Sequence, residues 1–268
     1  MKYIRVPVFF HIPKNAGTYV YNVSFQFLRL NSFDPLGIWN LEITKNDRLS
    51  YRLICKPKDK SRDEKYRKIN NAHLRRVDIE DLDLEDLEIY FLEVCDVSFN
   101  SCAEDIYKFL PVNVKPYEFL FLREPYERIL SLFSYIKSEQ SKHEVTHKSI
   151  ENKSFINYLN SPQLEGSWLI RNFLKIPNEV PITEDHFKKT CKILDDMIVC
   201  DTKYVDASIK KVLKDCYNLD ATFDFGKVFA NKTKEKPDIP FDSLDHETRD
   251  RFMLQTYWDY KLYKKYVH

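Results

Sequence analysis

The sequence predicts an α/β protein with a central parallel β-sheet flanked by helices. Short apolar segments alternate with amphipathic segments along the 268 residues, which is the order of strands and helices in such folds. The apolar segments are almost continuous hydrophobic runs, as in parallel strands that are buried on both faces. Two of them end directly in polar motifs, and ligands bind at the carboxyl ends of the strands in open sheets of this class.

The predicted strands are short apolar runs bounded by polar residues, at 6–12, 89–94, 117–122 and 197–200. The predicted helices repeat apolar residues every three or four positions, at 17–30, 101–110, 126–137, 154–159, 162–174, 183–194, 206–216 and 243–266. The polar segments 56–68 and 138–153 are interpreted as solvated loops or as a rim that contacts an acceptor, and the acidic segment 77–88 as a surface helix or loop. No repeat or low-complexity linker divides the chain, so we expect one domain over residues 1–268.

The composition is that of a folded protein without a general affinity for polyanions. Apolar residues make up 43% of the chain and aromatic residues 15%, and the net charge is only +1, which provides no field for nucleic acid or a membrane surface. No run approaches the roughly 20 apolar residues of a membrane span. We therefore expect a cytoplasmic protein with no nucleic-acid partner and no membrane segment, with a Golgi or secreted setting left open if an anchor was trimmed.

The cysteines do not have the spacing of a metal site. None of the six forms a CxxC pair, which argues against structural zinc. A chain of this length can build a core without disulfides. We expect the six cysteines to be mostly reduced and buried: Cys55, Cys95, Cys102, Cys191, Cys200 and Cys216.

The first polar motif is "HIPKNAGT", residues 11–18, between the first predicted strand and helix. A helix start presents unpaired N–H groups and the positive end of the helix dipole to an anion. Gly17 allows the backbone to approach that anion closely, Lys14 adds a point charge and Thr18 a hydroxyl. The alternative is a plain strand-to-helix turn, with Gly17 selected for its dihedral angles and Lys14 exposed. The motif matches neither the P-loop GxxxxGK[ST] nor the dinucleotide GxGxxG pattern.

The second motif, "YEFLFLREPYERILSLFSYI", repeats the order of strand, polar loop and helix. Arg123 stands at the end of the strand and Ser131 on the helix that follows, so a guanidinium fork and a hydroxyl are available to hold a second phosphate. The alternative is that Arg123 and Arg128 form surface ion pairs with Glu124 and Glu127.

Together, "HIPKNAGT" and "LREPYERILSLF" resemble the PAPS-dependent sulfotransferases, most closely the type-2 carbohydrate group with the heparan sulfate 2-O- and chondroitin-type enzymes. The order of "FANKTKEKP", at 229–237, and the aromatic, acidic helix after it is similar to this family. "SWLIRNFL", at 167–174, is a weaker match. The resemblance spans most of the chain and implies a P-loop-kinase-like sulfotransferase fold.

The resemblance also implies a donor, 3′-phosphoadenosine 5′-phosphosulfate (PAPS), and a product, 3′,5′-ADP (PAP). The residues that match the loop around the 5′-phosphosulfate are Pro13, Lys14, Asn15, Ala16, Gly17, Thr18 and Tyr19. The residues that match the 3′-phosphate contacts and the loop that closes over the nucleotide are Arg123, Ser131, Asn231, Lys232 and Thr233. Many members have Thr where this chain has Asn15 and Ser where it has Tyr19, so we expect different contacts beside the phosphosulfate at Tyr19.

The implied reaction is in-line transfer of the sulfuryl group to a hydroxyl or amine of a carbohydrate or small-metabolite acceptor. Positioning and charge stabilisation dominate such transfers, and we expect Lys14 to stabilise the leaving oxygen without a metal. The strand "EIYFLEVCDVSF" lacks the histidine that many type-2 members use as a base. Glu93 is the first candidate for the base, His73 the second and Glu42 the third.

Two other functions remain open. A chain that kept the nucleotide cradle but lost its base would be a catalytically inactive PAPS- or PAP-binding protein. A nucleotide kinase with an atypical phosphate loop is the other alternative. Binding of 3′,5′-ADP compared with ATP distinguishes the kinase, and turnover with a set of acceptors distinguishes the enzyme from the binder.

Overall fold

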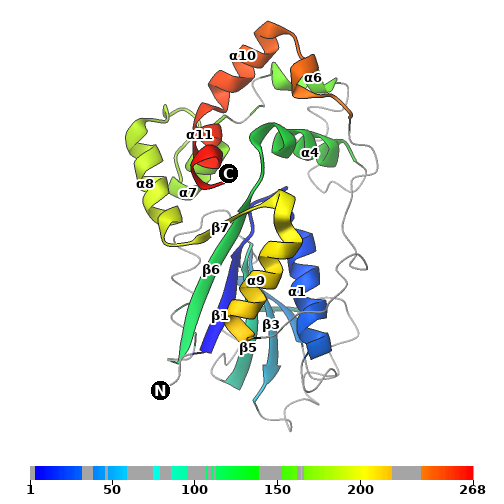
Figure 1. Ribbon diagram of the computed structural model, residues 1–268, viewed down its shortest axis with the longest axis vertical. Helices are drawn as coiled ribbons and strands as arrows, with labels where there is room; N and C mark the ends of the chain where they lie inside the picture. The colour runs from blue at the N-terminus through cyan, green and yellow to red at the C-terminus, as the bar shows by residue number, and fades with distance from the viewer. Residues whose placement is uncertain are drawn as a thin grey trace. The chain divides into compact units, whose positions relative to one another are not determined.

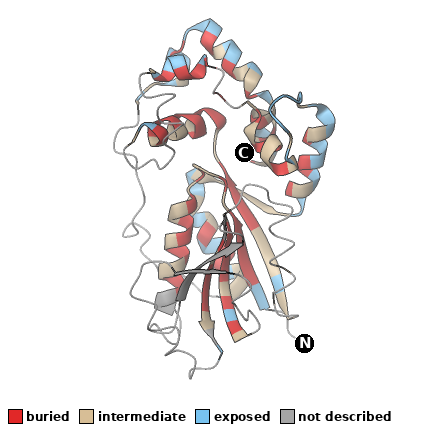
Figure 2. Ribbon diagram, turned by 180° about the vertical axis from the view of Figure 1, so that it is seen from behind, coloured by how far each residue is buried: buried red, intermediate tan, exposed pale blue. Residues whose placement is uncertain are grey.

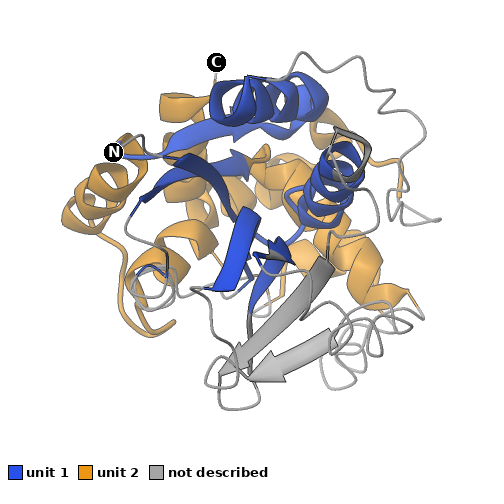
Figure 3. Ribbon diagram, turned by 90° about the horizontal axis from the view of Figure 1, so that it is seen from below, with its two compact units in different colours: residues 1–121, 196–230 blue, residues 122–195, 231–268 orange. Residues whose placement is uncertain are grey.

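The computed structural model describes residues 4–31, 39–45, 48–58, 75–78, 86–95, 107, 110, 113–138, 153–161, 164, 166–218 and 237–267. The chain divides into two compact units, residues 1–121 with 196–230 and residues 122–195 with 231–268 (Figure 3). The β-sheet belongs to the first unit, and the described part of the second is helical. That the chain forms one domain stays a prediction.

The sheet has seven strands in the order β4-β2-β3-β5-β1-β6-β7. Their bounds are β1 (Ile4–Phe10), β2 (Trp39–Lys45), β3 (Arg48–Pro57), β4 (Arg75–Asp78), β5 (Leu87–Val94), β6 (Val114–Leu122) and β7 (Ile198–Asp201). Strand β1 pairs in parallel with β5 and β6, whereas β3 is antiparallel to both β2 and β5. The predicted α/β class is confirmed, but the sheet is mixed: β1, β5 and β6 at its centre and β2 with β4 at its edge are parallel, while β3 is antiparallel to its neighbours.

Strands β2, β3 and β4 were not predicted, because they are not continuous apolar runs. Strand β3, "RLSYRLICKP", instead alternates apolar and polar residues over much of its length, the period of an antiparallel strand. Its Tyr51, Leu53 and Cys55 are buried. Strand β4 overlaps the start of the acidic segment that was interpreted as a surface helix or loop.

Two helices of the first unit, α1 (Gly17–Asn31) and α9 (Val205–Tyr217), cover the same face of the sheet (Figure 1). A short 3₁₀ turn, η4 (Thr202–Tyr204), precedes α9. The core beneath them includes four phenylalanines with ring centroids 5.2–6.2 Å apart, mostly edge to face, a favourable aromatic geometry: Phe9, Phe91, Phe119 and Phe121.

The register of the strands determines which polar side chains lie on this face of the sheet. Phe9 of β1 pairs with Glu93 of β5, and Glu93 pairs with Arg52 of β3. Paired residues point to the same side and side chains alternate along a strand. Residue 11, two positions after Phe9, therefore continues the same face beyond the end of β1. The strand residues that point the other way, such as Val8 and Phe10, are buried as well; Figure 2 shows how much of the central strands is buried.

The second unit is built from short helices around an aromatic and aliphatic core. Their bounds are α4 (Pro125–Lys137), α6 (Phe155–Leu159), α7 (Trp168–Leu174), α8 (Glu184–Asp195), the 3₁₀ turn η6 (Phe241–Ser243), α10 (His246–Gln255) and α11 (Tyr257–Tyr266). The core includes Tyr126, Ile129, Phe133, Phe155, Tyr158, Leu244 and Phe252.

Two predicted helices of this unit have different bounds. The helix predicted from residue 162 begins at Trp168, because Ser167 before it has a left-handed φ of 55°. The helix predicted over 243–266 is two helices that meet at Thr256, which has φ −100° and ψ 10°. The Thr256 hydroxyl donates to the Phe252 carbonyl, at 2.7 Å, a bond that commonly bends helices. The predicted helix 101–110 lies almost wholly outside the described residues.

The expectation of reduced, buried thiols holds in part among the described residues. Cys55, Cys95, Cys191, Cys200 and Cys216 are free thiols, and the first and third of these are buried. Within the described residues, no helix combines the length and the hydropathy needed to cross a bilayer.

A buried carboxylate caps helix α7. Ser167 makes no side-chain cap; instead, Asp259 of α11 accepts a hydrogen bond from the Leu169 N–H at 3.1 Å. Its other oxygen is buried without a hydrogen-bond partner among the described residues. Burial raises the pKa of Asp259 to about 6, although the Arg128 guanidinium acts in the opposite direction. Arg128 is itself buried and lies 4.6 Å from the Trp168 ring.

This raised pKa predicts a measurable pH dependence of stability. Ionised Asp259 destabilises the folded state because its carboxylate is buried. As the pH falls, Asp259 takes up its proton near pH 6 in the folded chain but only at a lower pH in the unfolded chain, so wild type gains stability between pH 7 and pH 5. Asp259→Asn should therefore be more stable than wild type at pH 7, and its advantage should shrink by about 1 kcal/mol at pH 5. Urea unfolding of both proteins at the two pH values measures this. An advantage that does not change with pH would contradict the assignment.

Candidate functional site

The loop between β1 and α1 is tight and held by its own backbone. The Asn15 N–H donates to the Ile12 carbonyl at 3.1 Å, and the Val20 N–H donates to the Ala16 carbonyl at 3.0 Å. Lys14 and Ala16 have left-handed φ values of 67° and 65°. This conformation costs a residue other than glycine roughly 1–2 kcal/mol, and such strain clusters at functional sites.

The loop's glycine has a steric role that the sequence did not reveal. Gly17 does not have a positive φ, so the alternative that a glycine is needed here for its dihedral angles is wrong. A Cβ at this position would lie 1.9 Å from Nε2 and 2.1 Å from Cδ2 of His11. The glycine thus leaves room for the His11 imidazole against the first residue of α1.

Two residues in which the chain departs from the sulfotransferase pattern have partners inside the first unit. Asn15 is buried, and its Nδ2 donates to the carbonyl of Phe121 in β6 at 2.7 Å. This bond anchors the loop to the sheet. The Tyr19 hydroxyl donates to Asp206 of α9 at 2.6 Å; burial, and then this carboxylate, raises the pKa of Tyr19. Tyr19 therefore braces α1 against α9.

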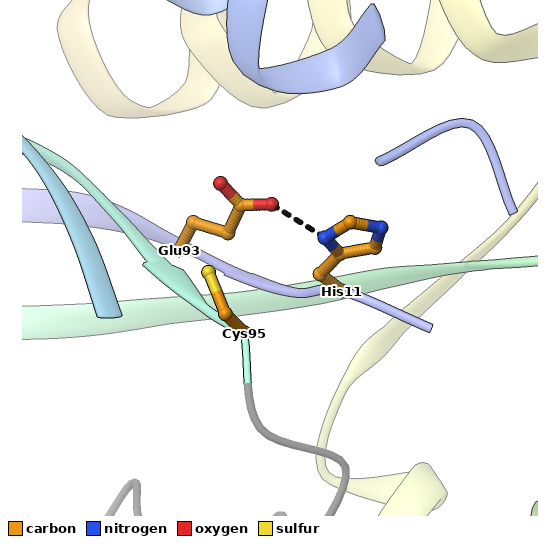
Figure 4. A group of neighbouring side chains, drawn as sticks. All are labelled: His11, Glu93 and Cys95. Carbon is orange, nitrogen blue, oxygen red and sulfur yellow. Dashed lines mark ion pairs between the residues drawn. The ribbon is translucent and has the colours of Figure 1, made fainter. Parts of the chain in front are cut away.

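The most distinctive polar group of the first unit joins His11, Glu93 and Arg52. His11 Nδ1 lies 2.8 Å from Glu93 Oε1 (Figure 4), and Arg52 Nη2 lies 2.5 Å from the same carboxylate. The Glu93 side chain is fully buried, whereas the His11 side chain is 22% exposed. The His11 ring also stacks on Phe9 at 5.8 Å, so contacts on several sides determine its orientation.

Arg52 is in turn fixed by an aromatic ring. Its guanidinium carbon lies 4.2 Å from the centroid of the Tyr21 ring in α1, a cation–π contact. Burial by itself lowers the pKa of Arg52, but the Glu93 carboxylate more than offsets this and the net shift is upward. Burial also raises the pKa of the Tyr21 phenol well above its ordinary value. Arg52 therefore remains charged and Tyr21 neutral at ordinary pH.

His11, Glu93 and Cys95 also have metal-ligating atoms within 4.8 Å of one another. Nitrogen, oxygen and sulfur ligands of this kind suit zinc. However, the Glu93 carboxylate is already balanced by Arg52 and engaged with His11 Nδ1, and a cation would have to displace both. These residues fit an orienting ion-pair network better than a metal centre.

Most of the second motif, from residue 122 onward, lies in the second unit. Arg123 follows β6, and its Nη2 is 3.9 Å from the Glu127 carboxylate, which is too long for a hydrogen bond. Glu124 accepts the Glu127 N–H at 2.8 Å as the N-cap of α4. Ser131 lies on α4 and is partly exposed. Arg128 is buried, so a surface pair does not describe it, and the 3.9 Å approach of Arg123 to Glu127 agrees with the ion-pair alternative in part.

Several predicted site residues lie outside the described residues or have only their backbone described. The positions outside are His73, Asn231, Lys232 and Thr233. Glu42 lies in β2, and only its backbone is described. Their proposed roles stay predictions.

The sequence reasoning missed His11 and Arg52 as site residues. In the sequence, His11 ends the first apolar run, and a histidine at the carboxyl end of a central strand is itself a signal for a site. Arg52 lies in a strand that was not predicted. The alternation of β3 was the signal that places Arg52 on the same face as Glu93.

Comparison with known proteins finds no relative of this chain: no protein-family model, no curated protein and no solved structure matches it. The resemblance to sulfotransferases therefore rests on the sequence motifs.

Proposed function

We propose that this protein is a PAPS-dependent sulfotransferase with the P-loop-kinase-like arrangement of that family. It transfers the sulfuryl group of PAPS to a hydroxyl or amine of a carbohydrate or small-metabolite acceptor. The observation that carries the proposal is the junction of β1 and α1, where a central parallel strand ends in a tight loop that contains Lys14 and enters a helix directly. Such a junction binds phosphate or sulfate through helix N–H groups.

The chemistry of the loop suits the 5′-phosphosulfate of the donor. The first N–H groups of α1 have no partners within the helix, and both Lys14 and Thr18 are partly exposed. The side chains of Asn15 and Tyr19 are engaged with Phe121 and Asp206. We therefore assign the phosphosulfate contacts to the loop backbone, the Lys14 ammonium and the Thr18 hydroxyl.

The remaining donor contacts follow from the family resemblance. Arg123 and Ser131 of the second unit are proposed for the 3′-phosphate, since a guanidinium binds phosphate through two parallel hydrogen bonds. The loop with Asn231, Lys232 and Thr233 is proposed to close over the nucleotide.

In the proposed reaction, the acceptor oxygen or nitrogen attacks sulfur as the bond from sulfur to the bridging oxygen breaks. Negative charge develops on that oxygen, and Lys14 stabilises it in the transition state. PAP leaves with this charge, and the acceptor proton passes to a base. The residues of this chain thus position the donor and balance charge, as in phosphoryl transfer.

Calorimetric titration with 3′,5′-ADP and with ATP tests the donor assignment. We expect 3′,5′-ADP to bind at least 10-fold more tightly than ATP, because only the former carries a 3′-phosphate for Arg123. Arg123→Ala should remove most of that preference, while His246→Gln, an exposed position on α10, should not change it. Binding of ATP without binding of 3′,5′-ADP at millimolar concentration would favour the kinase alternative.

Turnover separates the enzyme from an inactive binder. The protein is incubated with PAPS and a set of monosaccharides, oligosaccharides, small alcohols and amines, and PAP release is measured. We expect acceptor-dependent release with at least one class. Tight binding of 3′,5′-ADP with no release across the set would favour the binding protein.

A further inference from the structure

We infer that His11 is the general base of the proposed sulfuryl transfer and that Glu93 and Arg52 are its positioning residues. This inference rests on the proposed function and moves the proton-accepting atom from Glu93, the first candidate from the sequence, to the imidazole beside it. It is carried by three observations: the hydrogen bond at Nδ1, the place of Nε2, and the burial of the carboxylate.

The hydrogen bond determines which nitrogen can accept a proton. An ionised carboxylate only accepts hydrogen bonds, so the contact of 2.8 Å between His11 Nδ1 and Glu93 Oε1 assigns the proton to Nδ1. The neutral ring then has its lone pair on Nε2. This is the arrangement in which a carboxylate orients a histidine base in hydrolase triads.

The position of Nε2 directs that lone pair to the proposed donor loop. Nε2 is the His11 atom nearest to the Cβ that Gly17 lacks, 1.9 Å from its ideal position. Gly17 is the first residue of α1, where the sulfuryl donor is proposed to bind. The lone pair therefore lies beside the reaction centre of the proposed function.

Accessibility separates the roles of His11 and Glu93. The Glu93 side chain has no exposed surface, while His11 is 22% exposed. An acceptor molecule can therefore reach the imidazole but not the carboxylate. A general base must come within hydrogen-bond distance of the proton that it removes, and of this pair only His11 has exposed side-chain surface from which to do so.

The surrounding charges suit a base that gains and loses a proton. Glu93 faces the ring from β5 and stabilises the imidazolium, and Arg52 from β3 balances Glu93 while the ring is neutral. Cys95 lies beside the pair at the end of β5, and Tyr21 of α1 contacts Arg52. Lys14, three positions after His11, adds a positive charge to the loop.

The proton transfer balances within the proposed reaction. As the acceptor oxygen forms its bond to sulfur, the O–H bond breaks and the proton moves to His11 Nε2. The electron pair of the breaking sulfur–oxygen bond leaves with PAP. The resulting imidazolium is held between Glu93 and the loop until it releases the proton to water, which restores the neutral ring.

The test uses three variants and the acceptor with the highest turnover in the set described above. His11→Gln should lower kcat about 100-fold or more and remove the acidic limb of the pH profile of kcat/KM. Glu93→Gln should also lower kcat, because the glutamine amide can donate to Nδ1 and favour the tautomer with its proton on Nε2. Arg52→Lys keeps the charge and should shift the acidic limb with a smaller loss of kcat.

Controls distinguish this inference from the proposed function and from misfolding. His246 forms a pair with Asp250 at 3.0 Å on the surface of α10, with its side chain 83% exposed. His246→Gln is thus a matched control, and its kcat should stay within threefold of wild type. The affinity of His11→Gln for 3′,5′-ADP should stay within threefold as well. If wild type does not bind 3′,5′-ADP, the proposed function is overturned. If wild type and His11→Gln both bind it, a change in kcat of the variant reports on the base alone.

A measurement on the unmodified protein completes the test. The nitrogen chemical shifts of the His11 ring in a ¹⁵N-labelled sample should show a protonated Nδ1 and an unprotonated Nε2 at neutral pH. The opposite tautomer would overturn the inference. It would also be overturned if His11→Gln retained kcat within threefold while His73→Ala abolished turnover.

Discussion

Lys14→Ala is expected to slow sulfuryl transfer about 100-fold or more. The ammonium is proposed to stabilise the charge on the leaving oxygen, so its removal should raise the barrier more than it weakens donor binding. Lys14 is partly exposed in the loop between β1 and α1, so loss of its side chain should leave the fold intact. Single-turnover rates with saturating PAPS and an acceptor measure the effect apart from binding.

Two variants control for strain and for charge. Lys14→Gly removes the same side chain but adopts φ 67° without steric cost, so it should be as slow as the alanine variant and at least as well folded. Lys203→Ala removes an exposed positive charge from the first unit and should keep the wild-type rate. A Lys14→Ala protein within threefold of the wild-type rate would exclude the role of Lys14 at the leaving oxygen.

Gly17→Ala is expected to destabilise the protein by about 1–3 kcal/mol and to displace the proposed base. The new methyl group would overlap the His11 ring, 1.9 Å from Nε2, so either the imidazole or the start of α1 must move. Urea unfolding measures the change in free energy. The neighbouring Thr18→Ala, at a partly exposed position of α1, should change it by less than about 0.5 kcal/mol.

A double-mutant cycle assigns this cost to the contact. If the overlap with the ring is the cause, Gly17→Ala should destabilise much less in a His11→Ala background, because the methyl group then occupies the space that the ring vacates. We expect an interaction energy of about 1–3 kcal/mol between the two positions. Additive effects would show that Gly17 is required for another reason.

The hydrophobic pattern predicted the elements whose local signal is strong. Strands β1, β5, β6 and β7 and helices α1, α4, α8 and α9 lie within a few residues of their predicted bounds, because continuous apolar runs and regular amphipathic repeats report burial directly. The strands β2 to β4 have weaker local patterns, and their pairing with one another and with β5 supplies what local sequence does not. The antiparallel direction of β3 is a property of that pairing.

By itself, the sequence determined the α/β class, the junction of strand, loop and helix at "HIPKNAGT", and the motif that contains Arg123 and Ser131. Only the tertiary structure decided what surrounds the loop. The parallel register of β1 and β5 and the antiparallel register of β3 and β5 bring Glu93 of β5, Arg52 of β3 and His11, just beyond the end of β1, to one face. Side chains on neighbouring strands meet only when the strands are in register, and no local pattern around any one of these residues specifies that register.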